Sequence, residues 1–116
     1  MTGNIGTILY MSPEVLRDEV SLETSTKTDV YSFGIIMYEV FFEKLPYNEN
    51  NSCSSLGLSR KVTKGLRPFI PDGIMETISE PEKDYLRLMQ ECWVREPKDR
   101  PSFEDIYTVF MDMRFT

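Results

Sequence analysis

The sequence predicts an all-α fold, and two observations carry that prediction. A hydroxyl residue with a carboxylate three positions later occurs at Thr26, Ser79 and Ser102. This pairing is typical of a helix start, because the two side chains satisfy backbone donors of the first turn. Behind Ser79 and Ser102, apolar residues recur with a period close to 3.6 residues. The 116 residues leave room for one domain of marginal stability.

Residues 26–43 are expected to form a central helix that Thr26 and Asp29 cap. Its apolar side chains surround the axis instead of lining one stripe: Val30, Tyr31, Phe33, Ile35, Ile36, Met37, Tyr38, Val40, Phe41 and Phe42. A helix of this kind belongs in the middle of a core. The rest of the chain supplies few helices to cover it, so we expect an isolated chain to be unstable, self-associating or dependent on a partner.

A shorter helix is expected within residues 54–65. It covers Leu56 to Lys64 and ends at Gly65 in the C′ position, with Pro68 shortly beyond. Its cap is either Ser54 or Ser55. Residues 47–52 and 67–73 are rich in Asn, Pro and Gly turn residues and are expected to be loops.

Two amphipathic helices are expected at 79–95 and 102–114. The apolar set of the first is Tyr85, Leu86, Leu88, Met89, Cys92 and Trp93, and that of the second is Phe103, Ile106, Tyr107, Val109, Phe110 and Met113. Both sets fit one helical face that packs against a core.

Composition excludes several classes of function. A net charge of -6 argues against nucleic acid as a partner, because nucleic-acid binders concentrate Lys and Arg on one face. The chain has no histidine, and Cys53 and Cys92 lie far apart, so we expect no zinc site and two free thiols. Free thiols and the lack of a secretory signal favour a cytoplasmic protein. Residues 30–45 are apolar but too short to span a bilayer.

Four motifs, taken together and in order, resemble one known family. They are Gly-Thr-Ile-Leu-Tyr-Met-Ser-Pro-Glu at 6–14, Asp-Val-Tyr-Ser-Phe-Gly at 29–34, Gly-Leu-Arg-Pro at 65–68, and Cys92-Trp93 followed by Pro97 and Arg100-Pro101. This order resembles the substrate-binding lobe of eukaryotic protein kinases, entered partway through the activation segment, from Gly6 to about Phe110. Residues 1–17 would then be the end of that segment. The residues in these motifs are most similar to those of the tyrosine-kinase-like group of serine/threonine kinases.

The resemblance implies structural roles for three charged residues. Glu14 and Arg100 match the glutamate and arginine that the family joins in a buried ion pair; the alternative is two unrelated surface charges. Asp29 matches an aspartate that binds the backbone of the catalytic loop. Because the chain contains no such loop, we favour a capping role for Asp29 at the start of the central helix.

The resemblance also implies a place for substrate. Thr7 matches the residue that flanks the pocket for the residue after the phosphoacceptor, and Gly6, Ile8, Leu9 and Tyr10 would shape that pocket. The alternative is a flexible N-terminal tail. Trp93 is expected to be a core aromatic with no ligand role, and so is Tyr85.

The catalytic motifs of the family are absent from this sequence. It contains no Gly-rich loop, strand lysine, His-Arg-Asp loop or Asp-Phe-Gly. We therefore expect no catalytic, cofactor-binding or metal-binding residue in the chain, while ATP and magnesium are implied for a full-length relative. Two hypotheses remain: a truncated part of a serine/threonine kinase, whose partners are protein substrates and the missing segments of the domain, or a non-catalytic module that docks a partner.

Overall fold

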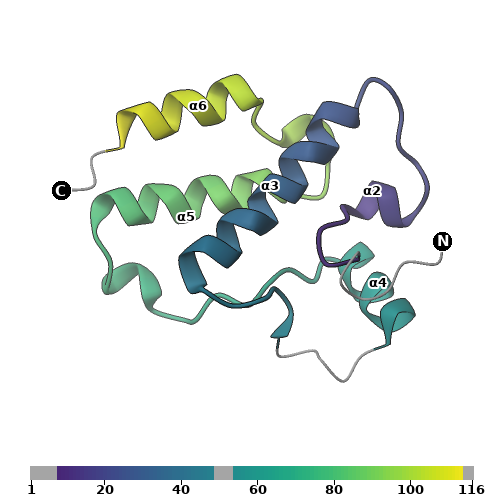
Figure 1. Ribbon diagram of the computed structural model, residues 1–116, viewed down its shortest axis with the longest axis horizontal. Helices are drawn as coiled ribbons and strands as arrows, with labels where there is room; N and C mark the ends of the chain where they lie inside the picture. The colour runs from purple at the N-terminus through teal and green to yellow at the C-terminus, as the bar shows by residue number, and fades with distance from the viewer. Residues whose placement is uncertain (1–7, 49–53, 114–116) are drawn as a thin grey trace.

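The computed structural model describes residues 8–48 and 54–113, and within these ranges all regular structure is helical. This confirms the all-α prediction. Figure 1 shows the α-helices: α2 (Pro13–Leu16), α3 (Ser25–Phe42), α4 (Ser55–Thr63), α5 (Glu80–Cys92) and α6 (Phe103–Asp112). Two short 3₁₀ turns, η2 (Ile74–Glu76) and η3 (Pro97–Asp99), precede and follow α5. Within residues 8–48 and 54–113, none of the helices combines the length and the hydrophobicity that a membrane span requires.

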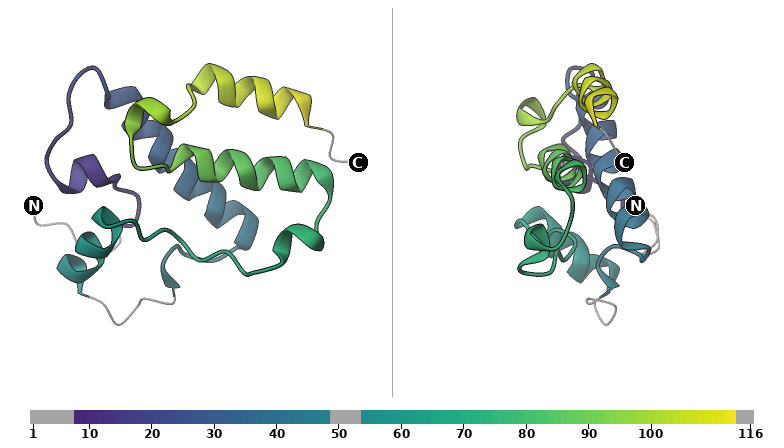
Figure 2. Two further views of the ribbon diagram at one scale, coloured as in Figure 1. Left: turned by 180° about the vertical axis from the view of Figure 1, so that it is seen from behind. Right: turned by 90° about the vertical axis from the view of Figure 1, so that its left-hand side faces the viewer.

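The helices form two groups in a thin molecule. Helix α3 crosses α5, and α6 runs along the outer side of α5, while α2 and α4 lie together at the other end (Figures 1 and 2). The molecule measures 44 × 34 × 19 Å. A helix with its side chains is roughly 10–12 Å wide, so the thin direction holds only two helices.

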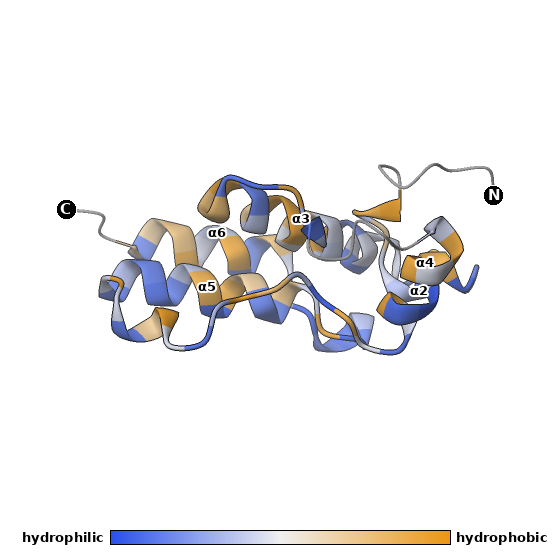
Figure 3. Ribbon diagram, turned by 90° about the horizontal axis from the view of Figure 1, so that it is seen from below, coloured by the Kyte–Doolittle hydropathy of each residue, from blue (hydrophilic) through white to orange (hydrophobic). Residues whose placement is uncertain are grey.

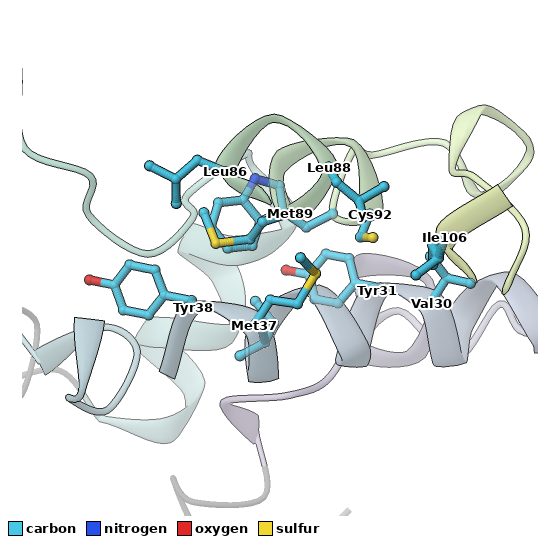
Figure 4. Close-up of a cluster of buried hydrophobic side chains, with 11 residues drawn as sticks. Val30, Tyr31, Met37, Tyr38, Leu86, Leu88, Met89, Cys92 and Ile106 are labelled. Carbon is cyan, nitrogen blue, oxygen red and sulfur yellow. The ribbon is translucent and has the colours of Figure 1, made fainter. Parts of the chain in front are cut away.

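The core lies where α3 meets α5, and Figure 4 shows side chains of the two helices pointing toward one another. Its buried members are Val30, Tyr31, Ile35, Met37, Tyr38, Leu86, Leu88, Met89, Cys92, Trp93 and Ile106. The helices approach most closely at Gly34, where an added Cβ would lie 2.7 Å from the Cβ of Cys92 and 3.1 Å from the carbonyl oxygen of Met89. Glycine is therefore required for this crossing.

Helices α5 and α6 begin where their capping signals place them. Ser79 accepts from the backbone N–H of Glu82, and the Glu82 carboxylate accepts from the N–H of Ser79; Ser102 and Asp105 repeat the arrangement. Both capping boxes are confirmed. Hydrophobic and hydrophilic stretches alternate along the two helices (Figure 3), as one-sided packing requires.

Helix α4 has well-defined ends. The Ser54 side chain accepts from the N–H of Gly57, which decides between the two expected caps. At the other end Gly65 has φ +119°, and the N–H groups of Gly65 and Leu66 donate to the carbonyls of Val62 and Lys61. This is a Schellman ending, which glycine adopts without strain. The inner face of α4 contributes to a second buried cluster, formed by Ile8, Leu9, Tyr47, Leu58 and Val62.

The expected start of the central helix was wrong. Helix α3 begins at Ser25 after the N-cap Thr24, which makes no side-chain capping bond, and Thr26 already lies inside the first turn. The physical reason is that this turn is fixed by tertiary contacts: Thr28 donates to Glu14, and Lys27 donates to the carbonyl of Arg100. Side-chain capping therefore does not determine where α3 begins.

Helix α3 is also covered on fewer sides than its composition suggests. Ile36 and Val40 lie one turn apart and are 47% and 67% exposed. Their neighbours Phe33, Phe41 and Phe42 are only partly buried. Within the described residues the chain thus leaves one apolar face of its central helix in solvent.

Candidate functional site

The structure brings Glu14 and Arg100 together although they are 86 positions apart. Arg100 donates from Nη1 to Glu14 Oε2 at 2.7 Å and from Nη2 to Oε1 at 2.9 Å. The side-chain exposures are 0% for Arg100 and 5% for Glu14. Such a parallel, two-bond pair is the strongest geometry available to an arginine and a carboxylate.

All five N–H groups of the Arg100 guanidinium have an acceptor. Besides Glu14, Nε donates to the carbonyl of Val94 at 2.9 Å, Nη1 to that of Lys27 at 2.9 Å, and Nη2 to that of Arg95 at 3.1 Å. A guanidinium offers five donors in fixed directions, and a lysine could not replace them. Arg100 therefore ties α2, the start of α3 and the chain after α5 to one point.

The Glu14 carboxylate is held in its charged form. Burial by itself would raise its pKa, but the hydrogen bonds from Arg100 and from Thr28 Oγ1, at 2.7 Å, outweigh burial and lower the pKa from 4.5 to about 2. The carboxylate thus stays ionised and paired over the pH range in which cells operate.

Tyr31 links this pair to a second arginine. The guanidinium carbons of Arg100 and Arg67 lie 5.1 and 5.2 Å from the centre of the fully buried Tyr31 ring. Arg67 also donates to the carbonyls of Trp93 at 2.7 Å and Val62 at 3.1 Å. The aromatic ring provides a favourable surface for both cations. Arg67 thereby joins the end of α4 to the end of α5.

The expected substrate-facing residues fall into three groups. Gly6 and Thr7 lie outside the described residues. Ile8 and Leu9 are buried, at 2% and 9% exposure, in the cluster beneath α4. Tyr10 is half-buried and its hydroxyl donates to Glu39 of α3, a bond that with burial raises the pKa of Tyr10 to about 12.

The main chain of this segment is anchored as well. Ser32 Oγ of α3 donates to the carbonyl of Tyr10 at 2.8 Å. Residues 8–14 are thus held at two points, by the Tyr10 contacts to α3 and by the Glu14 pair with Arg100.

Asp29 and Trp93 occupy different surroundings. Asp29 is exposed in the second turn of α3, too far from the helix start to cap it, so the expected capping role was wrong. Trp93 is 6% exposed within the main core, with its ring centre 6.3 Å from that of Tyr38. No group of three or more Cys, Asp or Glu residues in the described ranges could hold a metal ion.

Sequence reasoning missed several residues that build this site. The sequence assigns Arg67 no role beyond its place in the Gly-Leu-Arg-Pro motif, and Lys27 and Thr28 fall within the expected central helix without a role of their own. Their partners are backbone carbonyls or a distant carboxylate, which no local pattern indicates.

Comparison with known proteins decides the family. The profile described as "protein tyrosine and serine/threonine kinase" matches residues 2–110. This chain belongs to that kinase family. The chain matches a "probable LIM domain-containing serine/threonine-protein kinase" of Dictyostelium discoideum at 41% identity, over 91% of this chain and 10% of that protein.

Two further kinase relatives have similar coverage. The RGS domain-containing serine/threonine-protein kinase A of Dictyostelium discoideum is 35% identical over 89% of this chain and 8% of its own length. The mouse receptor-interacting serine/threonine-protein kinase 4 is 36% identical over 97% of this chain and 14% of its own length. The chain therefore spans about a tenth of the length of such relatives, and it corresponds to part of a kinase domain.

Proposed function

We propose that this chain is the substrate-binding part of a serine/threonine kinase of the tyrosine-kinase-like group. The protein that contains it would transfer the γ-phosphoryl group of ATP, with magnesium, to serine or threonine of protein substrates. It would act in the cytoplasm, where the buried Cys92 thiol stays reduced.

The observation that carries this proposal is the double attachment of residues 8–14. Tyr10 is joined to α3, and Glu14 is joined to Arg100 by two hydrogen bonds. Phosphoryl transfer in kinases depends on positioning and electrostatic stabilisation. A rigid segment next to the substrate supplies the positioning, while the chemical groups would come from other parts of a kinase domain.

A phosphorylation assay tests the proposal. The longest protein that contains this chain is incubated with magnesium, radiolabelled ATP and a mixed serine, threonine and tyrosine peptide library. We expect label on serine and threonine, and a strong loss of labelling for Arg100→Ala. Labelling of tyrosine alone would contradict the serine/threonine assignment, and labelling without magnesium would contradict the metal requirement. The 116-residue chain alone is expected to transfer no phosphate.

A second function is favoured by one specific observation. Beside the exposed Val40, an open hollow of about 460 Å³ is lined by Val40, Phe41, Ile78, Glu82 and Tyr85. An exposed apolar surface of this kind suits a protein contact. A non-catalytic module that docks a partner there would fold cooperatively and give no phosphoryl transfer in any longer form of the protein.

A further inference from the structure

Charge is distributed unevenly along this chain. Of its 13 basic residues, four lie within residues 54–71, and none of its 19 acidic residues does. Those four are Arg60, Lys61, Lys64 and Arg67. The remaining chain is strongly acidic. A short basic stretch in such a protein stands out against its own background.

Three of the four cations share the solvent side of α4. Arg60, Lys61 and Lys64 are exposed, whereas Leu58 and Val62 on the opposite side are buried. Leu56, Arg60 and Lys64 follow one another at intervals of four residues, so they lie along one line of the helix. Leu56 is 60% exposed. We name Leu56, Arg60 and Lys64 the basic face of α4.

Stabilisation of the helix end does not account for Arg60 and Lys64. Basic residues near a helix C-terminus commonly satisfy its last carbonyls. Here other donors already do so: Arg67 donates to Val62, and Arg95 Nη1 donates to the carbonyl of Thr63 at 2.7 Å. The exposed Arg95 also adds a further positive charge beside α4.

We propose that the basic face of α4 binds an acidic segment of a protein partner, with Leu56 contacting an apolar residue of that segment. If the proposed function holds, this partner is the kinase substrate, because α4 packs on α2 and covers Ile8 and Leu9. An acidic stretch on the substrate would then dock beside the segment that faces its phosphoacceptor. Outside residues 54–71 the chain has 9 basic and 19 acidic residues, and this excess of negative charge repels extended anionic surfaces such as membranes and nucleic acids.

Helix α4 is suited to this role because it is rigid. It is capped by Ser54, closed at Gly65, and tied to the end of α5 by Arg67 and Arg95. A preformed charged surface loses little conformational entropy on binding. Recognition by α4 therefore does not require the chain to rearrange.

The test is a fluorescence anisotropy titration of the 116-residue chain with a labelled peptide of Glu and Asp around one central Leu. Reversing two cations with Arg60→Glu and Lys64→Glu should weaken binding by about tenfold or more. The matched control reverses Lys83 and Arg87, which have the same four-residue spacing on α5, and should change the affinity by less than about twofold.

A second variant and two competing ligands distinguish the proposal from loss of folding and from other kinds of partner. If the reversed helix loses its circular dichroism, Arg60→Gln with Lys64→Gln removes the charges without reversing them and should weaken binding by about threefold. Equal losses in the α4 variant and the control, or no loss in either, would overturn the proposal. Tighter binding to phosphatidylserine vesicles or to an oligonucleotide than to the peptide would overturn the protein partner. Because the titration contains no ATP, its result is independent of the phosphorylation assay.

Discussion

Gly34 and Cys92 are in such close contact that a methyl group on Gly34 would lie 2.7 Å from the Cβ of Cys92. We predict that Gly34→Ala destabilises the chain by about 1–3 kcal/mol, because the added group forces α3 and α5 apart. This loss should occur although alanine improves helix propensity by roughly 1 kcal/mol. Urea unfolding followed by circular dichroism measures it.

Gly57 in α4 provides the control for that substitution. An added Cβ there meets only the side-chain oxygen of Ser54, at 3.2 Å. Gly57→Ala should therefore cost far less than Gly34→Ala. Equal effects would show that helix crossing is not the reason for the glycine in α3.

Loss of the arginine in the buried ion pair should strongly destabilise the chain. Arg100→Ala leaves Glu14 charged and without its partner, which typically costs about 3–5 kcal/mol. This is enough to remove the cooperative transition of a marginal domain. Arg100→Lys should rescue little, because lysine cannot reach the same set of acceptors.

The exposed pair of Arg87 and Asp84 gives a matched comparison. Its N–O distance of 3.1 Å is similar, but both side chains are more than half exposed. Arg87→Ala should cost less than about 1 kcal/mol. A cooperative transition of Arg100→Ala at the same midpoint as the unsubstituted chain would contradict the structural role of the bridge.

Acid should unfold the chain through Glu14. Its pKa is about 2 in the folded state and 4.5 when unperturbed, so its contribution to stability is present above pH 4.5 and is lost as the pH falls toward 2. The contribution is on the order of 3 kcal/mol. The unfolding free energy measured across this window should fall, and Glu14→Gln should be less stable at neutral pH but show a flatter profile. A profile that is as steep for Glu14→Gln would assign the acid sensitivity to other groups.

Cys92 should react slowly with thiol reagents. It is completely buried, and burial raises the pKa of its thiol to about 12, which removes the reactive thiolate. In a Cys53→Ser background, alkylation should be at least about a hundredfold slower than in denaturant, because opening of the core limits it. Rapid labelling in buffer would show that the α3–α5 core does not form in the isolated chain.

The exposed apolar residues Ile36 and Val40 of α3 should be the contact through which chains associate with one another. Ile36→Lys with Val40→Lys is expected to lower the sedimentation coefficient of associated chains toward the monomer value without loss of helicity, because both residues are exposed. Ile35→Lys, one position away but fully buried, should instead abolish folding. Unchanged association of the double variant would place the contact elsewhere.

Local signals and tertiary contacts explain which features the sequence could predict. The caps at Ser79 and Ser102 follow from neighbouring residues alone, so their helices begin as expected. The start of α3 depends on where Thr28 and Lys27 meet residues far along the chain, and the local Thr26 signal was misleading.

The same distinction applies to the site. Glu14 and Arg100 were expected to pair through a family resemblance, since nothing local joins them. Arg67 had no assigned role, because a side chain that donates to backbone carbonyls needs no particular residue type as its partner. Exposure of Ile36 and Val40 could not be read from an apolar helix whose coverage depends on the remaining elements.

The position of Arg100 has a consequence for the order of folding. Its guanidinium donates hydrogen bonds to acceptors on residues 14, 27, 94 and 95. The bond between residues 14 and 100 therefore closes a loop that contains most of the described chain. Contacts between residues this distant in sequence form slowly, because chain entropy is lost before they stabilise anything. During synthesis the apolar α3 leaves the ribosome well before α5, and its core face remains without cover until then. We expect a chaperone to bind nascent chains in which α3 has left the ribosome and α5 has not.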